Sequence, residues 1–528
     1  MFDHSFLPPA GLEFVVLADT HHMVDPGDAP LEFESRRKQT TRAEHALRLA
    51  ASLEAPFLVH LGDLIQEFPG TSLYARALAE VRAQLARHGV RVHHVAGNHE
   101  VGDKPDPTMP TPPVTREALA AYHDLFGPSW YSFDAGGVHF VVLNSSILNA
   151  ALPEAVVQHQ WLEADLAAHH RARVFVFMHH PPYLYDAQEP ALGHYDNVSE
   201  PDRSWLLGLI RRHGVEMLFA GHSHFAWLDR IGRTRYVVAT STSFTRPGFS
   251  EVFSSGPPDE RGRDDAGKLG FYLVRVQDDG TRVHFIRTRA AEDAEEQQAA
   301  TGEASGRRLL TRLPRDLPHS PLGVTLLHPL AHAADVPLAW PSVVRQRVRN
   351  DYPLLSLLEL GVRHVRVPAS DLDDPLQGRR LAVLRDEGVS ITAAWLWSAA
   401  LDLPAAVARL RGQLDTVEVQ IAGQRWPPDA CLEQLRRCAG DSGLPITLAP
   451  VLPNERVAGK QHPRTRIGYH PSELAELDRH LARHQTRVDR VLCRIGPGFS
   501  PWDVIAESLS LPSFGHIGAV DWGIGLPA

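Results

Sequence analysis

Residues 12–21 read Leu-Glu-Phe-Val-Val-Leu-Ala-Asp-Thr-His, and this stretch determines how the first half of the chain folds. Its apolar part is rich in Val, Leu and Phe and is too short for a helix, so it predicts a buried strand. Asp19 and His21 follow that strand directly. Because alternate residues of an extended chain point the same way, we expect this carboxylate and this imidazole to face one point.

Four more apolar runs end in the same way, each followed by residue types that bind metal ions. They read Leu61-Gly-Asp63, Ala96-Gly-Asn-His-Glu100, Met178-His-His-Pro-Pro182 and Ala220-Gly-His-Ser-His224. A strand places the next residue at a fixed position on one sheet edge, so five such ends can converge on one site. The glycines allow tight turns and a close approach of the backbone. Any one of these patterns says little, but five in order indicate a metal centre.

The first half alternates short apolar runs with amphipathic segments. The runs that we expect to be strands are 12–18, 57–61, 91–96, 139–143, 174–178, 217–220, 235–240, 271–276 and 283–286. The expected helices are 36–53, 74–88, 156–170 and 203–213. This alternation predicts an α/β fold in which sheet is layered between helices.

The second half also alternates apolar runs with amphipathic segments, after a stretch of different composition. Residues 289–306 are polar, small and acidic, and we interpret 289–318 as a linker, with an exposed helix as the alternative, between a domain at 1–288 and a domain at 319–528. Seven strand–helix units follow between Gly323 and Asp521, which favours a (β/α) barrel-like domain. An open, doubly wound sheet is the alternative.

The composition is that of a globular protein. A length of 528 residues predicts two to four domains at roughly 150 residues each. Hydrophobic residues make up 43% of the chain and charged residues 22%, which argues against disorder. The 53 basic and 63 acidic side chains give a net charge of −10 without a long basic run, so we expect no binding to nucleic-acid polymers.

The three cysteines and the first residues of the chain are used to predict the cellular compartment. Cys431 and Cys438 lie on an expected helix and Cys493 in an expected strand, so we expect reduced, packed thiols and no disulfide framework. The first residues carry neither a basic nor an apolar leader region, and later apolar runs are far shorter than a membrane span. We therefore expect a cytoplasmic protein without membrane association.

The five strand-end motifs resemble those of the calcineurin-like metallophosphoesterase superfamily over roughly residues 12–250. Residues 126–134 with 137–143 look like a strand pair, and 160–166 like a helix, of its cyclic-nucleotide phosphodiesterase and purple-acid-phosphatase-like branch. The resemblance implies a β-sandwich flanked by helices in the first domain. It also implies two divalent metal ions bound by the five motifs.

Carried over motif by motif, the resemblance implies two sets of metal ligands that share one aspartate. One ion would be held by Asp19, His21, Asp63 and His224, and the other by Asp63, Asn98, His179 and His222. Oxygen and imidazole ligands together suit Mn, Fe or Zn. His180 is interpreted as a neighbour of the site, and His22 as a solvated or core histidine.

The resemblance also implies a role for His99 and excludes one for a tyrosine. The histidine of the Asn-His pair lies beside the leaving group in the family, so His99 would donate a proton to the departing alkoxide. Purple acid phosphatases place a tyrosinate ligand three residues after the bridging aspartate. Gln66 occupies that position here, so we expect no Fe(III)–tyrosinate chemistry.

The expected function is hydrolysis of a small phosphodiester, such as a cyclic nucleotide or a glycerophosphodiester. Two ions about 3.5 to 4 Å apart can share a bridging hydroxide that attacks phosphorus in line, and they supply positive charge to an acidic protein. A phosphomonoesterase is the first alternative. The second is a bifunctional or carbohydrate-recognising enzyme whose barrel selects the phosphorylated substrate.

Two loops and the second domain offer further candidates. Loops 101–115 and 184–201 are long enough to wall the site, and the second contains Tyr185, His194 and Tyr195, with Tyr183 just before it. In the second domain the expected strand ends carry Arg366, Trp395, Trp397, Glu418, Gln420, Arg425, Asn454, Glu455, Arg494 and Asp521. Tryptophans with charged residues would suit a sugar-like ligand, although barrels also bury such residues for packing.

Overall fold

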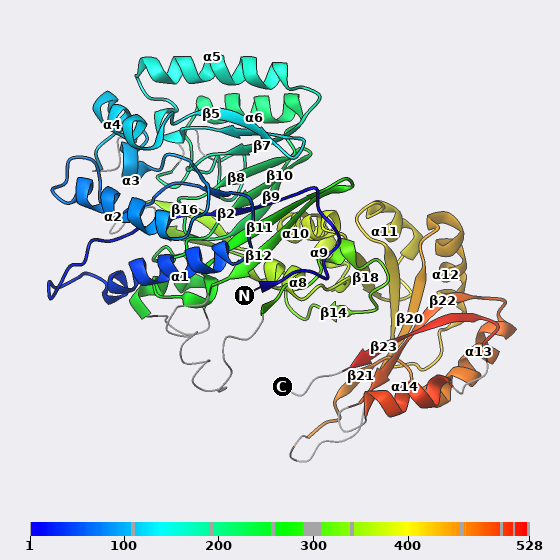
Figure 1. The fold of residues 1–528 in the computed structure, drawn as a ribbon. Helices are drawn as coiled ribbons and strands as arrows, with labels where there is room; N and C mark the ends of the chain where they lie inside the picture. The colour runs from blue at the N-terminus through cyan, green and yellow to red at the C-terminus, as the bar shows by residue number, and fades with distance from the viewer. Residues whose placement is uncertain are drawn as a thin grey trace. The chain divides into compact units, whose positions relative to one another are not determined.

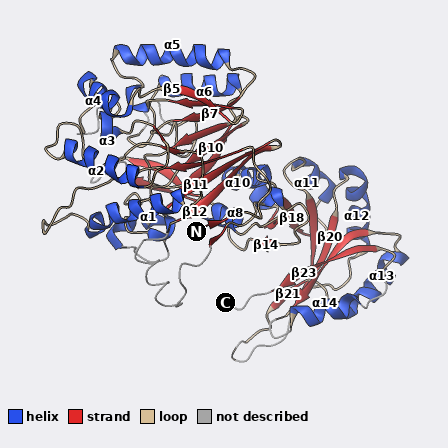
Figure 2. Ribbon diagram, in the orientation of Figure 1, coloured by secondary structure: helices blue, strands red, loops and turns tan. Residues whose placement is uncertain are grey.

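The computed structural model of the chain has two compact units. It describes residues 2–106, 111–189, 194–254, 259–288, 308–337, 343–453, 459, 461–496, 500–509 and 513–524. The first unit comprises Met1–Asp316 with Ala331–Leu360, and the second Leu317–Leu330 with Gly361–Ala528. Figure 2 shows helices and strands alternating throughout both units, which confirms the expected α/β class.

Two sheets form the centre of the first unit (Figure 1). One has the order β12–β11–β2–β3–β4, with β2 Leu12–Leu17, β3 Leu58–His60, β4 Val92–His94, β11 Gly270–Gln277 and β12 Gly280–Arg287. The other has the order β5–β6–β7–β8–β10–β9, with β5 Tyr131–Ala135, β6 Val138–Val142, β7 Arg173–Phe177, β8 Met217–Ala220, β9 Trp227–Ile231 and β10 Thr234–Val238. In each sheet the strands that lead to the metal-binding motifs are parallel, so these strands end at one edge.

Aromatic side chains fill the space between the two sheets. Phe14 of β2 lies 5.2 Å from Phe140 of β6 and 6.1 Å from Phe177 of β7, measured between ring centroids. Val15 and Leu17 point to the other face of β2 and join a separate hydrophobic cluster under the helices. A strand covered on both faces has apolar residues at successive positions, as residues 12–18 do.

Helices cover the outer faces of both sheets (Figure 1). α1 Gln39–Ala51 and α2 Tyr74–Arg87 pack on the five-stranded sheet, where Leu47 and Val81 share a cluster with Val15. α5 Pro153–Ala168 and α6 Asp202–His213 lie over the six-stranded sheet. The first unit also contains β1 Phe2–Asp3, which pairs with β13 Arg308–Leu309, and the helices α3 Asn98–Val101 and α4 Arg116–Phe126.

A hairpin and a helix from beyond the expected linker belong to the first unit. They are β15 His332–Pro337, β16 Arg345–Asn350 and α8 Tyr352–Glu359. Arg349 is buried, with its guanidinium 3.2 Å from Asp229 Oδ2 and donating to the carbonyl oxygen of Leu184 at 3.1 Å. Trp227 Nε1 in turn donates to the carbonyl oxygen of Arg349 at 2.6 Å. These contacts attach the hairpin to loops and strands of the sandwich.

This packing differs from the expected division into 1–288, 289–318 and 319–528. Ala331–Leu360 packs with the first unit, although the expected boundary assigns it to the second domain. Residues 289–307 of the expected linker lie outside the described residues. The division into functional domains therefore stays a prediction.

The second unit is a curled half-barrel. Its strands run in chain order, β14 Gly323–Thr325, β17 His364–Pro368, β18 Ser390–Leu396, β19 Thr416–Ala422, β20 Ile446–Pro453, β22 Val488–Ile495 and β23 Ile517–Ile524, all parallel, while β21 Thr465–Ile467 pairs antiparallel with β20. The helices are α9 Ser370–Asp373, α10 Pro375–Asp386, α11 Leu403–Arg409, α12 Asp429–Ser442, α13 Leu474–Arg483 and α14 Pro501–Leu509. Within the described ranges, no strand pairing joins β14 to β23, so the sheet is barrel-like but open. The sequential strand order argues against a doubly wound sheet.

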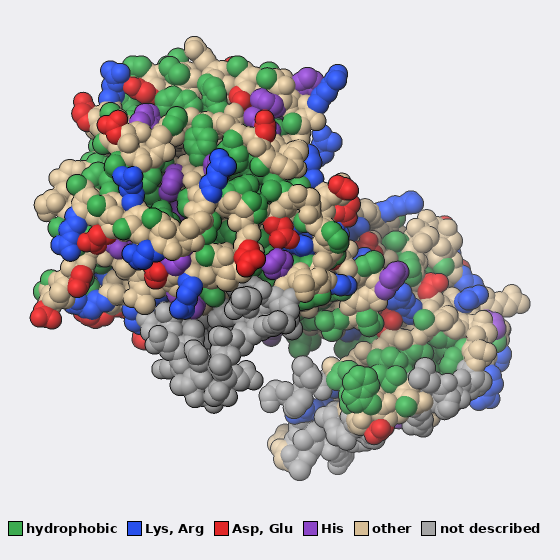
Figure 3. All heavy atoms as spheres, viewed as in Figure 1, with side chains coloured by type: hydrophobic (Ala, Val, Ile, Leu, Met, Phe, Trp, Pro, Cys, Tyr) green, Lys and Arg blue, Asp and Glu red, His purple; other side chains and the backbone are tan. Residues whose placement is uncertain are grey.

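Three further observations concern the whole chain. The cysteines are free and buried, Cys431 and Cys438 on α12 and Cys493 on β22, as predicted. In the face drawn in Figure 3, basic and acidic side chains are interspersed. Among the described residues, no helix combines the length and the apolar character needed to cross a lipid bilayer.

Candidate metal centre

The ends of the central strands bring all the predicted ligands together. Asp19 follows β2, Asp63 follows β3, and Asn98 begins α3 after β4. His179 and His222 follow β7 and β8 of the opposite sheet. The candidate side chains are at most 8% exposed, so the cluster lies in a region of low dielectric constant.

One group of side chains consists of Asp19, His21, Asp63 and His224, whose ligand atoms all lie within 4.8 Å of one another. His21 Nε2 is 3.0 Å from His224 Nε2 and 3.5 Å from Asp63 Oδ2. His224 Nε2 is 3.4 Å from Asp19 Oδ1. This is the first of the two sets that the resemblance implies.

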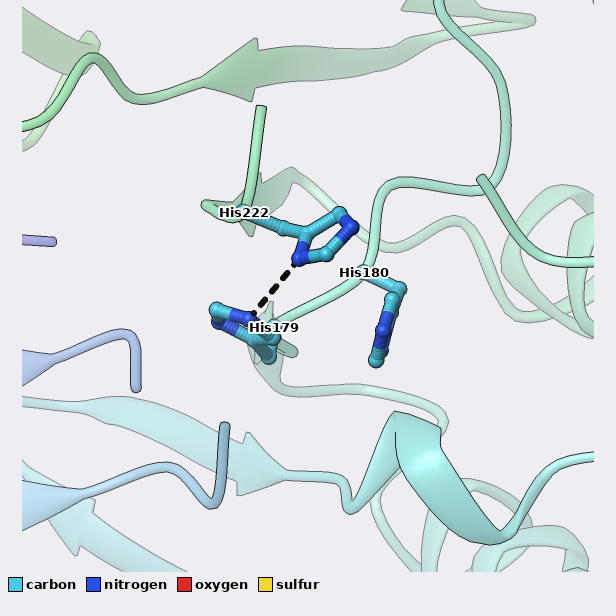
Figure 4. Close-up of side chains that lie close together, drawn as sticks. All are labelled: His179, His180 and His222. Atoms are coloured by element: carbon cyan, nitrogen blue, oxygen red, sulfur yellow. Dashed lines mark hydrogen bonds between the residues drawn. The ribbon is translucent and has the colours of Figure 1, made fainter. Parts of the chain in front are cut away.

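A second group of side chains lies beside it and consists of Asn98, His179 and His222. Asn98 Oδ1 is 2.9 Å from His179 Nε2 and 3.1 Å from His222 Nδ1, and these two nitrogens are 3.2 Å apart. Figure 4 shows His179 and His222 turned toward each other, with His180 beside them. His179 Nδ1 donates to the carbonyl oxygen of Leu61 at 2.8 Å, which directs its Nε2 into the group.

Asp63 touches both groups. Its Oδ2 is 3.5 Å from His21 Nε2 on one side and 3.3 Å from His179 Nε2 on the other. Its Oδ1 accepts a hydrogen bond from the backbone N–H of His99 at 3.0 Å. The carboxylate is thus oriented by the protein between two sets of ligand atoms, as a bridging ligand would be.

The backbone at these positions is strained. Ten described non-glycine residues have a positive φ, and five of them are Asp19, His21, Asp63, His222 and His224, with φ between 42° and 68°. Side chains with a Cβ adopt this region at a cost, and such residues gather at functional sites. Asp19 and His21 do converge, as expected. The reason that we gave, an extended chain, is wrong, because both residues adopt the left-handed conformation. The same holds for His222 and His224, which turn toward different groups.

Two glycines make the close packing of these loops possible. Gly62 has a φ of +98°, and a Cβ there would lie 2.7 Å from the Cα of Gly97. A Cβ on Gly97 would lie 2.2 Å from the backbone nitrogen of Asp63. The predicted close approach of the backbone at these glycines is confirmed.

Glu100 holds two of the loops together, a role that the sequence reasoning missed. Its carboxylate accepts hydrogen bonds from the backbone N–H groups of Asp63 at 2.9 Å, Leu64 at 2.8 Å and Gly97 at 3.0 Å. Burial and the nearby Asp63 charge raise the pKa of Glu100 to about 8. Its position directly after the Asn-His pair was the signal that could have indicated this role.

His99 lies at the edge of the cluster. Its Nδ1 donates to the carbonyl oxygen of Gln66 at 2.9 Å, and its Nε2 is 3.9 Å from Asp63 Oδ2. The ring of Phe68 packs against it at 4.1 Å. The side-chain oxygen of Gln66 accepts a hydrogen bond from Gln39 at 2.8 Å, so it does not enter the ligand groups.

The electrostatics of the cluster favour neutral His21 and His222 and a protonated His179. Burial, followed by the neighbouring His99 and His224, lowers the pKa of His21 well below its usual value. Burial, followed by His180 and His179, does the same for the pKa of His222. Burial also opposes the charged form of His179, but the adjacent Asp63 carboxylate raises the pKa of His179 to about 9. Burial alone would raise the pKa of Asp63, but the neighbouring His179 and His99 lower it well below its usual value.

The donor set fits divalent metal ions. Two buried imidazole nitrogens 3.0 Å apart, His21 Nε2 and His224 Nε2, repel each other when both present lone pairs, and a cation between them removes that repulsion. Carboxylate, amide and imidazole ligands without a thiolate suit Mn, Fe or Zn. The site therefore fits the two ions that the resemblance implies.

The remaining candidates near the site separate into neighbours and packing residues. His180 contacts Ser145 Oγ at 3.0 Å through Nδ1 and lies 3.6 Å from Asp103. It also has a ring nitrogen within 4.8 Å of ring nitrogens of His179 and His222, so it borders the second group. His22 pairs with Glu80 at 3.0 Å. Tyr195, a candidate from the second wall loop, places its hydroxyl 3.3 Å from Asn98 Nδ2.

Tyr183 packs away from the site, because its hydroxyl donates to the carbonyl oxygen of Arg230 at 3.3 Å. The two expected wall loops are only partly described, since residues 107–110 and 190–193 lie outside the described ranges.

The charged candidates of the second unit pair with one another. Arg366 forms a two-pronged pair with Glu418, to which Gln420 also donates. Arg425 is 3.1 Å from Glu473, and Asp521 is 3.6 Å from Arg490. Asn454 and Glu455 lie outside the described residues. No fixed constellation comparable to the metal cluster emerges from the candidates that can be placed.

Comparison with known proteins agrees with this geometry. Residues 12–226 match the family described as calcineurin-like phosphoesterase. The chain is 29% identical over 203 residues to the human serine/threonine-protein phosphatase CPPED1, covering 37% of this chain and 60% of the relative. It is 26% identical over 281 residues to a probable cyclic nucleotide phosphodiesterase of Rhodococcus erythropolis, covering 53% and 84%.

A plant relative completes the comparison. The chain is 33% identical over 135 residues to purple acid phosphatase 23 of Arabidopsis thaliana, covering 25% of this chain and 27% of the relative. The chain thus spans about 60% of the length of the human protein and a quarter of the plant protein. All three similarities carry names of phosphoric ester hydrolases.

Proposed function

We propose that this chain, whose residues 12–226 form a calcineurin-like metallophosphoesterase domain, is a hydrolase of phosphoric esters that uses two divalent metal ions. The observation that carries the proposal is the position of Asp63 between two groups of converging ligand atoms. One ion would be held by Asp19, His21, Asp63 and His224. The other would be held by Asp63, Asn98, His179 and His222.

The chain's own residues would orient the reaction. When bound, two divalent ions would supply a hydroxide nucleophile near neutral pH and neutralise charge on the phosphoryl oxygens. His99 would donate a proton from Nε2 to the departing alkoxide, because its Nδ1 is already engaged with Gln66. Glu100 would keep Asp63 in place through the two loops that it joins.

The substrate that we propose is a small phosphodiester, such as a cyclic nucleotide or a glycerophosphodiester. The similarity to the Rhodococcus phosphodiesterase supports this proposal, since it extends over 84% of that protein. A second candidate is a phosphomonoester, because the human and plant relatives are named phosphatases. Gln66 in place of a tyrosine argues against a purple-acid-phosphatase type of iron site for either substrate.

The test is a panel of esters assayed after reconstitution with Mn, Fe, Zn or Mg. Bis(p-nitrophenyl) phosphate, a cyclic nucleotide and glycerophosphodiesters represent diesters, and p-nitrophenyl phosphate with a phosphoserine peptide represents monoesters. We expect metal-dependent turnover with kcat/KM at least tenfold higher for a diester. A monoester preference would replace the first candidate by the second. Absence of turnover of every ester by the metal-loaded protein would contradict the proposed function.

A further inference from the structure

Tyr195 lies beside the second group of candidate metal ligands. Its hydroxyl is 3.3 Å from Asn98 Nδ2, and its ring packs against the ring of His222 with 4.9 Å between the centroids. Asn98 and His222 both belong to the group that would hold the second ion. The side chain of Tyr195 comes from the loop after β7 and is half-buried. Its hydroxyl thus lies at the border of this group.

The hydrogen bond to Asn98 leaves the hydroxyl proton of Tyr195 available. Asn98 Oδ1 faces His179 Nε2 at 2.9 Å and His222 Nδ1 at 3.1 Å, and Nδ2 of the same amide faces Tyr195. An amide nitrogen only donates, whereas a phenolic oxygen both accepts and donates. The Tyr195 oxygen therefore accepts from Asn98 and keeps its own O–H. Within the described ranges, no acceptor lies within hydrogen-bonding distance of this O–H.

Two neighbours hold the ring of Tyr195 in place. The His222 ring contacts it, and the guanidinium of Arg246 lies over it at 5.3 Å from the centroid. A cation over the face of an aromatic ring is attracted to it electrostatically. Arg246 is positioned in turn by an ion pair, since its Nη2 is 3.1 Å from Asp196 Oδ2. These contacts restrict the direction in which the hydroxyl points.

The hairpin β15–β16 joins this arrangement from outside the matched domain, which ends at residue 226. Gln346 of β16 is buried, and its Nε2 donates to Asp196 Oδ2 at 2.6 Å. Asp196 is fully buried and directly follows Tyr195. A buried carboxylate needs such donors, because an unpaired charge is costly to bury. The same carboxylate oxygen thus connects the Tyr195 loop to the hairpin and to Arg246.

We propose that Tyr195 contacts the substrate and donates a hydrogen bond from its hydroxyl to a phosphoryl oxygen at the second ion. This inference rests on the proposed function and adds a substrate-contacting residue to its site. A donor that is held in place before the reaction stabilises the negative charge on the phosphoryl oxygens. Asp196 and Gln346 act through Tyr195 and are positioning residues. The hairpin therefore serves the reaction although it lies outside the matched domain.

The first test removes the hydroxyl alone. Tyr195→Phe in the metal-loaded full chain should lower kcat/KM for bis(p-nitrophenyl) phosphate about 10- to 100-fold, the usual loss of a hydrogen bond to a charged group. It should also weaken the binding of inorganic phosphate, measured by calorimetry, about tenfold. Metal content at saturating metal should stay unchanged. The matched control is Tyr183→Phe, whose hydroxyl faces the carbonyl oxygen of Arg230, and it should alter none of these quantities.

The second test separates positioning from folding. Gln346→Ala should lower kcat/KM and phosphate affinity about three- to tenfold, because Asp196 loses a donor. In the Tyr195→Phe background the same substitution should have no further effect, since no hydroxyl is left to position. A merely structural role of Gln346 would lower both quantities equally in the two backgrounds. Gln188→Ala, at an exposed glutamine of the loop after β7, is the control.

Unchanged kcat/KM and phosphate affinity in Tyr195→Phe would overturn the inference. A loss in Tyr195→Phe that saturating metal restores would overturn it as well, because the hydroxyl would then act only on the ligand Asn98. Equal effects of Gln346→Ala in the two backgrounds would overturn the positioning role of the hairpin. Failure of the unmodified, metal-loaded chain to hydrolyse any ester would instead overturn the proposed function, and this inference with it.

Discussion

The strand ends of both units carry charged and polar side chains, but the groups that face each other differ between the units. In the first unit, ligand atoms of like character face each other, as His21 Nε2 and His224 Nε2 do at 3.0 Å. In the second unit, charged side chains at strand ends face partners of opposite charge, as Arg366 and Glu418 do. We propose that the first arrangement takes up cations from outside the chain, whereas the second pairs opposite charges within the chain.

This difference shows how a ligand site can be told from a structural ion pair. The pairing of the half-buried Arg366 with the buried Glu418 satisfies both groups without any ligand. The metal-centre side chains are also buried, but their ligand atoms converge on one another at residues whose φ is positive, a costly conformation for side chains with a Cβ. Backbone strain and converging ligand atoms together favour a functional role for the first site.

The largest expected effect follows removal of the shared ligand. Asp63→Ala takes one ligand from each group, so metal content should fall from about two ions per chain to near zero, and turnover should fall to background. Metal analysis after dialysis, with turnover of nitrophenyl esters, measures both. Asp279→Ala, at an exposed carboxylate, is the control. Full metal content in Asp63→Ala would show that the two groups do not share a ligand.

Removal of His99 should separate chemistry from metal binding. His99→Ala should lower kcat by roughly 10²- to 10⁴-fold, the usual size of general acid–base catalysis, at unchanged metal content. The decrease in kcat should be smaller for nitrophenyl esters, because the nitrophenolate leaving group needs little protonation. Unmodified activity toward alkyl esters would remove His99 from the reaction.

Glu100 should act on the metals through Asp63. Glu100→Gln replaces one accepting oxygen with a donor that faces the backbone N–H groups of Asp63 or Leu64. We expect metal affinity to fall roughly 10- to 100-fold, the usual loss when a hydrogen-bond partner that orients a metal ligand is removed. The kcat at saturating metal should be largely retained. Competition with a fluorescent chelator measures the affinity. An unchanged affinity would reduce Glu100 to a role in folding alone.

Metal binding should release a proton. The pKa of His179 is raised to about 9 in the metal-free chain, so this imidazole is protonated at pH 7 and must become neutral to bind a metal. Affinity for the ion at Asn98, His179 and His222 should therefore rise about tenfold per pH unit up to about pH 9 and then level off. Calorimetry in buffers of different ionisation enthalpy counts the protons. Binding without proton release would contradict the pairing of His179 with Asp63.

The smallest expected effect on the metal centre comes from the second unit. Glu418→Gln leaves Arg366 without its charged partner and should destabilise that unit by about 2 kcal/mol, below the usual range for buried pairs because the Arg366 side chain keeps 18% exposure. Metal content and kcat/KM should stay unchanged. Loss of turnover on a correctly folded variant would show that the second unit takes part in the reaction.

Local sequence patterns were sufficient to predict the strands and the motifs that meet at one site, and the resemblance to the metallophosphoesterase superfamily implied the individual ligands. The runs ending at Ala18 and Ala220 are apolar over four residues or more, the run ending at Leu61 is interrupted only by His60, and each is followed by a motif of glycine, carboxylate or imidazole. Covered strands and parallel strand ends follow from these patterns by general rules. The convergence of the motifs was therefore predictable without knowledge of the tertiary structure.

The packing of the hairpin β15–β16 was not predictable, because it depends on contacts between residues far apart in the sequence. Arg349 bonds to Leu184, which lies 165 residues earlier, and no periodicity or motif signals such a contact. The left-handed backbone at Asp19 and His21 was also missed, since non-glycine residues rarely adopt it. Tertiary packing imposes both features on sequences that do not favour them locally.

The most direct test of the central claim is anomalous scattering from crystals of the full chain grown or soaked with Mn²⁺. We predict two anomalous peaks in contact with Asp63, one among Asp19, His21 and His224, the other among Asn98, His179 and His222. A single peak, or none at these side chains in crystals that contain manganese elsewhere, would contradict the two-ion account.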